Sequence, residues 1–417
     1  MSHTLTVTTR LDRAHIPASG GTVNLLVQLS APSSPTQSRL PLNLAAVVDR
    51  SGSMDGPKLE HTKQALRFLV DQVADRDRLA IITYDDQVQT LLPSQSLTHK
   101  DALKAQLACI ESGGSTNLSG GLATGMQQIT PHAGPDQLSR VLLMTDGLAN
   151  VGVTDPETLV GWVRTWRQRG LALSALGVGD DFNEDLLVAM AEAGGGSFHY
   201  IADPDQIPAI FAQELDGLLS VAAQALNLTV QAEPGVAIEG VIGYQPTGSP
   251  HAVSLTLPDL YGGEVKSLLV RLAVAAPPAD GKLVHLTLNY LPATANAMPQ
   301  TVDIDVNIHI SDDAALLAAP PDAEVSRQVK LADAAQAREE AVALADQGDL
   351  RGGARRLAEA AIVMESLATS GDTEAEQQMA ALRTQAEAME SDRYDKAARK
   401  QLRHDSFQTR QGRSPGR

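Results

Sequence analysis

The segment Asp49-Arg50-Ser51-Gly52-Ser53 places a carboxylate and two hydroxyls at alternate positions. It follows the apolar run LNLAAVV, which is typical of a buried strand. We therefore expect it at the carboxyl end of that strand, where ligands of open α/β sheets collect. Oxygen donors with few carboxylates suit Mg²⁺, which keeps several waters, whereas Ca²⁺ prefers more ligands. Asp49, Ser51 and Ser53 are thus predicted to bind a metal ion.

Two further oxygen donors are predicted to lie at the tops of neighbouring strands or loops. They are Thr116 in GGSTNLSGG and Asp146 in LLMTDG. The first segment alone could occur by chance and simply cap a helix through Ser53 or Asp55. The presence of Thr116 and Asp146 as well favours the metal site.

These motifs resemble a known family. DRSGSM, GGSTNL and LLMTDG look like the DxSxS, Thr and Asp elements of von Willebrand factor A domains, and the resemblance covers about residues 41–220. It implies a complete metal-ion-dependent adhesion site of bacterial type. The order of segments is more distantly similar to inter-alpha-trypsin inhibitor heavy chains.

The resemblance also implies roles for the five residues. Asp49, Ser51 and Ser53 would supply the first ligating oxygens, Thr116 a further hydroxyl, and Asp146 a carboxylate that acts directly or through water. The implied cofactor is Mg²⁺, with Mn²⁺ or Ca²⁺ as alternatives. An Asp or Glu of a protein partner would fill the open metal position, and a final helix at about 204–221 would slide on binding.

The apolar pattern predicts the fold that positions this site. LNLAAVV, LAIIT, VLLMT and LALSALGV alternate with helical stretches, which indicates a Rossmann-like α/β domain over 40–221, with a mainly parallel sheet between helices. In its first helix, one stripe of residues should face the sheet. These residues are Leu59, Thr62, Leu66, Leu69 and Val73.

Other segments are predicted on both sides of this domain. Period-two patterns over 222–312 indicate an antiparallel β-sandwich, and strands within 1–35 should complete it, separated from the A-type domain by the linker APSSPTQSRLP. Ala-rich and Glu-rich segments over 320–400 predict a helical hairpin or bundle. Residues 401–417 form a basic tail.

Composition restricts the function classes. The net charge of −17 and 3% aromatic residues argue against general nucleic-acid or anionic-membrane binding. Cys109 is the only cysteine, so no intramolecular disulfide can form, and it is predicted to be buried. We see no signal peptide and no apolar span of membrane length, and expect a cytoplasmic protein.

The end of the chain differs in charge from the rest. Residues 393–417 hold eight Lys/Arg and two Asp, so that this end carries +6 and the rest −23. We expect a solvated, partly disordered end. The alternative is an arm that docks on an acidic partner, another subunit or nucleic acid.

The predicted function is a Mg²⁺-dependent protein-interaction module or scaffold, not an enzyme. An alternative is an adaptor that delivers clients to a separate AAA+ ATPase of the MoxR kind, since the chain has no Walker motif. A hydrolase is not favoured, because no Ser-His-Asp set is evident. Asp85 and Asp86 are interpreted as a hairpin turn, and the pair Trp162 and Trp166 as cover for the sheet.

Overall fold

The computed structural model describes residues 5–32, 39–244, 246–278, 281–391 and 393–412. The chain divides into two compact units. The first unit comprises residues 1–33, 225–292 and 299–417, and the second comprises 34–224 with 293–298. The second unit is therefore an insertion in the sequence of the first. Most of the expected linker, residues 33–38, lies outside the described residues.

The second unit is built on a six-stranded sheet with the strand order β6-β5-β4-β7-β8-β9. Five strands are parallel and the edge strand β6 is antiparallel to β5. The strands are β4 (Leu42–Asp49), β5 (Arg78–Tyr84), β6 (Val88–Gln95), β7 (Leu138–Thr145), β8 (Leu171–Val178) and β9 (Gly195–Ile201). Every residue of β4, β7 and β8 is buried, as continuous apolar strands between two helical layers require.

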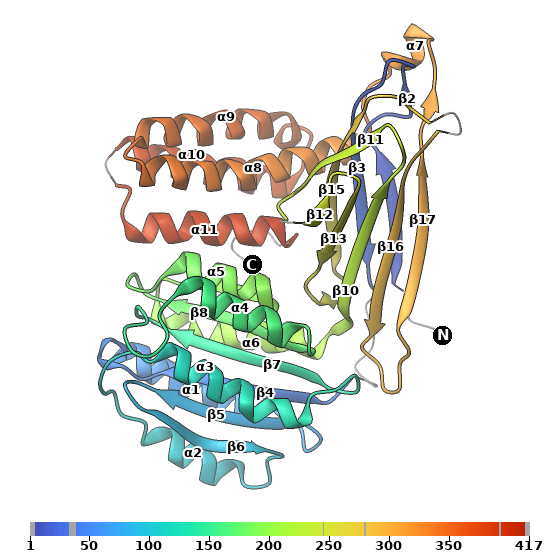
Figure 1. The fold of residues 1–417 in the computed structure, drawn as a ribbon. Coiled ribbons are helices and arrows are strands. Elements are labelled where there is room, and N and C mark those ends of the chain that lie inside the picture. Colours follow the sequence, from blue (N-terminus) through green and yellow to red (C-terminus); the bar gives the residue numbers. More distant parts are fainter. Residues whose placement is uncertain (1–4, 33–38, 245, 279–280, 392, 413–417) are drawn as a thin grey trace. The chain divides into compact units, whose positions relative to one another are not determined.

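Helices flank this sheet (Figure 1), and the predicted Rossmann-like α/β architecture is confirmed. They are α1 (Pro57–Gln72), α2 (Lys100–Ala108), α3 (Leu118–Ile129), α4 (Pro156–Arg167), α5 (Glu184–Gly194) and α6 (Ile207–Leu219). The predicted stripe of α1 is buried, with Val73 just beyond its last residue. Side-chain caps at Asn117, Asp155 and Asn183 fix the starts of α3, α4 and α5.

The first unit contains two antiparallel sheets and a small parallel pair. One sheet has the order β1-β3-β15-β11, so N-terminal strands pair with a strand from beyond the inserted unit. Its strands are β1 (Thr6–Leu11), β3 (Gly21–Ser30), β11 (Val236–Ile242) and β15 (Val265–Val274). The other has the order β12-β13-β10-β16-β17, with β14 paired to β10. Its strands are β10 (Val221–Ala232), β12 (Thr247–Ser249), β13 (Ala252–Thr256), β14 (Leu260–Tyr261), β16 (Lys282–Pro292) and β17 (Gln300–Asn307). The parallel pair is β2 (His15–Ile16) with β18 (His309–Ile310).

Helices complete the first unit. They are α7 (Ala314–Leu317), α8 (Ala323–Asp346), α9 (Leu350–Ala368), α10 (Thr373–Glu390) and α11 (Lys396–Arg410). Leucines, alanines and methionines of α8 to α11 share one apolar core, which confirms the predicted helical region. Val325 of α8 also packs against Leu26 and Leu269 of the first sheet.

The described part of the C-terminal end is not a solvated tail, contrary to the prediction. Residues 396–410 form α11, in which Leu402 and Phe407 are buried. Arg399 forms an ion pair with Asp346, at 2.8 Å, and Arg403 pairs with Glu339. The basic residues therefore neutralise acidic residues of α8 in the same chain. Residues 413–417 lie outside the described residues.

Two other sequence predictions need correction. Cys109 is exposed, because it follows the last residue of α2, whose buried positions are Leu103 and Leu107. The rings of Trp162 and Trp166 contact each other, with centroids 6.1 Å apart, but both side chains are only partly buried. The fully buried residues of α4 are Leu159 and Val163, which take the role predicted for the tryptophans. Among the described residues, no helix is both long and apolar enough to cross a membrane.

Candidate metal centre

The loop after β4 folds back at the carboxyl edge of the sheet. Ser51 and Gly52 lie against Gly113 and Gly114, since Gly52 N donates to Gly114 O at 3.1 Å and Ser51 forms a bridge with Gly113. A short helix, η2 (Gly52–Met54), then leads to α1. This path places the side chains of the loop next to the end of β7, the neighbour of β4 in the sheet.

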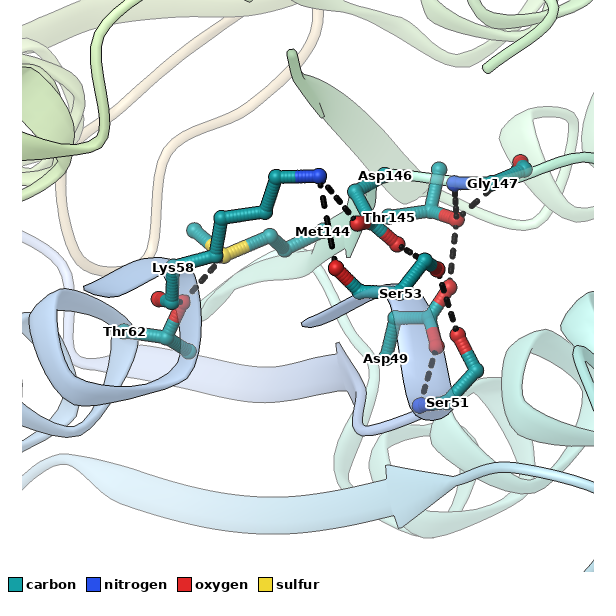
Figure 2. A network of polar contacts seen from close by, with 9 residues as sticks. All are labelled: Asp49, Ser51, Ser53, Lys58, Thr62, Met144, Thr145, Asp146 and Gly147. Carbon is teal, nitrogen blue, oxygen red and sulfur yellow. Dashed lines mark hydrogen bonds and ion pairs between the residues drawn. The ribbon is translucent and has the colours of Figure 1, made fainter. Parts of the chain in front are cut away.

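Four of the five predicted ligands are joined by hydrogen bonds (Figure 2). Asp49 Oδ1 accepts from Ser51 N at 2.8 Å, and the hydroxyls of Ser51 and Ser53 lie 3.2 Å apart. Ser53 Oγ donates to Asp146 Oδ1 at 2.6 Å. The loop after β4 and the end of β7 thus converge on one polar cluster.

Thr116, the fifth predicted ligand, borders the same cluster. A Cβ atom added at Gly147 would lie 3.3 Å from Thr116 Oγ1 and 3.6 Å from Ser53 Oγ. The backbone of Thr116 is fixed by Asn150, whose Oδ1 accepts from Thr116 N at 2.8 Å. The structure therefore brings together all five residues that the sequence singled out.

Both carboxylates of the cluster are inaccessible to solvent. Asp49 and Asp146 are each 0% exposed. Burial raises the pKa of Asp49, hydrogen bonds from Ser51 and Thr145 oppose this rise, and the negative charge of Asp146 adds to it. Two buried carboxylates beside two serine hydroxyls form a site of negative charge that a cation would stabilise.

Two residues of the cluster were not predicted from the sequence. Thr145 Oγ1 donates to Asp49 Oδ2 at 2.7 Å, and Lys58 Nζ donates to Asp146 Oδ2 at 2.6 Å. Thr145 directly precedes Asp146 at the end of an apolar strand, which was an available signal. Lys58 stands in the first turn of a helix, where a cation is electrostatically disfavoured, and this placement was the second signal.

Asp85 and Asp86 do not join the described cluster. Asp85 lies in the turn between β5 and β6, as interpreted from the sequence, and its Oδ2 is 2.9 Å from Arg50 Nη2. A Cβ atom added at Gly114 would lie 1.8 Å from Asp86 Oδ1, so this aspartate packs beside the glycine loop. Arg50, the arginine inside the DRSGS segment, therefore forms an ion pair with the turn between β5 and β6.

A second polar network lies beneath the last helix of this unit. Glu214 of α6 contacts Arg140 of β7 at 3.1 Å and His199 of β9 at 3.1 Å, and it accepts a hydrogen bond from Ser174 of β8. Burial alone would raise the pKa of Glu214, but hydrogen bonding to His199 and the charge of Arg140 outweigh it and hold the pKa far below its usual range. An ionised carboxylate therefore ties α6 to three strands.

Residues 43–213 match the family model of the von Willebrand factor type A domain. The chain carries a von Willebrand factor type A domain. Over 206 residues, which are 49% of the chain and 36% of the relative, it is 32% identical to the uncharacterised protein YfbK of Escherichia coli. Over 160 residues, 36% of the chain and 18% of the relative, it is 33% identical to human inter-alpha-trypsin inhibitor heavy chain H3. The chain thus spans well under half of these relatives.

A solved structure resembles the A domain together with the other segments. The von Willebrand factor type A protein of Catenulispora acidiphila aligns with 98% of this chain and 97% of its own length, with a TM-score of 0.74 and 17% identity. This likeness concerns the fold alone. It extends the structural similarity beyond the A domain to the antiparallel sheets and the helices.

Proposed function

We propose that the A domain binds a divalent cation, Mg²⁺ in the first place, through Asp49, Ser51, Ser53, Thr116 and Asp146. The observation that carries this proposal is the convergence of four of these side chains in one hydrogen-bonded cluster. The side-chain atoms of these residues that could bind a metal are all oxygens, which hard cations prefer. Among the described residues no group of three or more His, Cys, Asp or Glu residues could hold a metal, so the hydroxyls are essential to this assignment.

We further propose that the bound cation recruits an acidic side chain of a protein partner. Hydroxyls and water would fill part of the coordination shell of the ion and leave a position for a carboxylate from outside. The rim of the site supports a protein as the partner. Leu148 is 57% exposed two residues after Asp146 and offers apolar surface beside the polar cluster. This is a binding function and involves no catalytic step.

The partner can be sought in a lysate of the cells that make this protein. The full chain, its Asp49→Asn variant and its Asp86→Asn variant are immobilised and washed with Mg²⁺ or with EDTA. Asp86→Asn is the matched control, because it removes a neighbouring carboxylate from outside the cluster. The proposal expects a protein that is retained with Mg²⁺ by the wild type and by Asp86→Asn, and lost with EDTA or with Asp49→Asn.

A partner protein that is retained equally with EDTA and by the Asp49→Asn variant would contradict this proposal. Its binding would then be assigned to the first unit. The identity of a metal-dependent partner separates the two roles considered for the protein. An AAA+ ATPase of the MoxR kind would point to the adaptor role. A partner with an essential surface Asp or Glu and no ATPase activity would point to the scaffold role.

We also infer that the two antiparallel sheets of the first unit pack as a β-sandwich. In β16 the residues Leu283, Val284, Leu286, Leu288 and Tyr290 are buried. In β15 the residues Leu268, Val270, Leu272 and Val274 are buried as well. Arg271 of β15 and Asn289 of β16, on the opposite faces, are exposed, whereas Leu269 is buried against Val325 of α8. An apolar face on each sheet is the pattern that two facing sheets require.

A further inference from the structure

Lys58 points its ammonium group at the metal site of the A domain. Its Nζ lies 2.6 Å from Asp146 Oδ2 and 3.3 Å from the carbonyl oxygen of Ser53 (Figure 2). Asp146 is completely buried, whereas the side chain of Lys58 is 25% exposed. Lys58 therefore contacts the site from its solvent side, through the oxygen of Asp146 that Ser53 Oγ does not use.

The position of Lys58 is unfavourable for the helix itself. It is the second residue of α1, after Gly56 and Pro57, and no side chain caps this helix. Positive charge in the first turn opposes the helix dipole, which favours anions there. The local helix therefore gives no reason for a lysine here, and its partner is a carboxylate of the metal site.

We propose that Lys58 sets the affinity of this site for divalent cations, because its ammonium contacts the same Asp146 carboxylate that a bound ion would use. This inference rests on the proposed metal-binding function. The positive charge of the lysine therefore competes with the ion for this carboxylate. Since it is partly exposed and flexible, its ammonium has a path away from the site into solvent.

Lys58 also changes the net charge of the cluster. With ionised Asp49 and Asp146, the cluster carries −2 without Lys58 and −1 with it. A divalent cation brings these values to 0 and +1 respectively. Lys58 therefore weakens the attraction for the metal, and where its ammonium stays beside Asp146 the metal-loaded site is positive, which favours an incoming carboxylate.

The test is the binding of Mn²⁺ alone to the full chain. Isothermal titration calorimetry measures the affinity, and electron paramagnetic resonance measures the concentration of the free ion. The variants are Lys58→Met, which keeps the length and removes the charge, and Lys58→Arg, which keeps the charge. Lys63→Met is the matched control on the same helix, because Lys63 pairs with Glu60 at 2.8 Å and not with the site.

We expect Lys58→Met to bind Mn²⁺ on the order of ten-fold more tightly than the wild type, from removal of one nearby positive charge. Lys58→Arg and Lys63→Met should keep the wild-type affinity. Equal or weaker binding by Lys58→Met, in a variant with wild-type circular dichroism, would overturn the inference and leave the metal site intact. If the wild type and all variants bind no Mn²⁺, the proposed function itself fails, and this inference with it.

Discussion

The two carboxylates of the site, Asp49 and Asp146, are held by different kinds of partner. Asp49 accepts hydrogen bonds from neutral donors, the Ser51 amide and the Thr145 hydroxyl. Asp146 accepts from the Ser53 hydroxyl and from the Lys58 ammonium. Asp49 has no opposite charge among these partners, and the positive charge beside the site comes from Lys58. This difference makes Lys58 the residue that adjusts the charge of the whole cluster.

Gly147 lies beside Thr116, so that a methyl group added there tests whether Thr116 belongs to the metal site. A Cβ atom there would approach Thr116 Oγ1 to 3.3 Å, closer than most Cβ contacts. We expect Gly147→Ala to weaken Mg²⁺ binding several-fold, because Thr116 must shift, with little change in the unfolding midpoint. Calorimetric titration measures the affinity. Gly161→Ala is the control, since its Cβ would meet nothing within 4 Å. Unchanged affinity in Gly147→Ala would place Thr116 outside the site.

At the residue scale, the sequence was sufficient to single out the five proposed ligands and insufficient to identify the residues that contact them. The five predicted ligands belong to motifs with strong residue requirements, so they were recognisable. Thr145 and Lys58 were marked only by their places, before Asp146 and in the first turn of α1, and their roles depend on which oxygen of Asp49 or Asp146 each one reaches. Such a contact depends on side-chain geometry and has no spacing rule in the sequence.

At the scale of elements, α6 is joined to the sheet by a buried charge. Glu214 faces Arg140 and His199, and all three side chains are almost fully buried. A helix held only by apolar packing could shift along the sheet at small cost. A helix held by Glu214 must break a charged network to move, so the sliding of the final helix that the sequence analysis expected would require that network to rearrange.

We therefore predict a large effect of Glu214→Gln on stability. Glu214→Gln removes the negative charge from a buried ion pair with Arg140, and the loss of one partner of such a pair typically costs about 3–5 kcal/mol. Urea unfolding at pH 7, followed by circular dichroism, measures the loss. Glu157→Gln, at an exposed first-turn position of α4, should cost much less, about 0.5 kcal/mol. A cost for Glu214→Gln as small as that of the control would mean that apolar packing alone holds α6.

Asp77 gives a pH-dependent prediction for the elements at the start of β4. Burial opposes its ionisation, but a bidentate contact with Arg39, at 2.8 and 2.7 Å, and two backbone amides outweigh burial and lower the pKa of Asp77. A lowered pKa in the folded state stabilises the protein above the unfolded pKa, about 4, and this contribution is lost as the pH falls through the folded pKa.

The expected result is a difference between wild type and Asp77→Asn that depends on pH. The wild type should be the more stable protein at pH 6 and 7, and its advantage should shrink as the pH falls from about 4 toward 2. Urea midpoints at several pH values measure this change. An advantage that stays constant over the whole range would contradict a role for the ionised carboxylate.

The elements themselves were predictable where the periodic pattern was strong. The strands β4, β7 and β8 and the stripe of α1 followed from apolar runs and helical spacing. The prediction failed at Cys109 and in residues 396–410. Cys109 adjoins an apolar run but follows the end of α2, and the basic residues of α11 find acidic partners on α8. Both outcomes depend on contacts between segments, which composition and charge counts do not contain.

At the scale of the whole molecule, the proposed metal site belongs to the inserted A domain alone. All five proposed ligands lie in the second unit, which the chain enters after residue 33 and leaves at 224, apart from the short segment 293–298. The first unit is closed by the pairing of β3 with β15, which brings together sequence from both sides of the insertion.

We therefore expect a fragment of residues 39–224 to bind Mg²⁺ with the affinity of the full chain. Calorimetric titration of both proteins makes the comparison, with circular dichroism as the check of folding. A folded fragment that binds much more weakly would show that the first unit contributes to the site. The lysate experiment with the same fragment would then tell whether partner binding also needs the first unit.

The most direct test of the central claim is the equilibrium binding of Mg²⁺ to the full chain and to Asp49→Asn, measured by isothermal titration calorimetry at pH 7. The variant keeps the size of the side chain and removes one of the two buried carboxylate charges. We predict one Mg²⁺ per wild-type chain and at least a hundred-fold weaker binding by Asp49→Asn, on the order of the loss of one charged ligand. No binding by the wild type, or equal binding by the variant, would contradict the assignment of this cluster as a metal site.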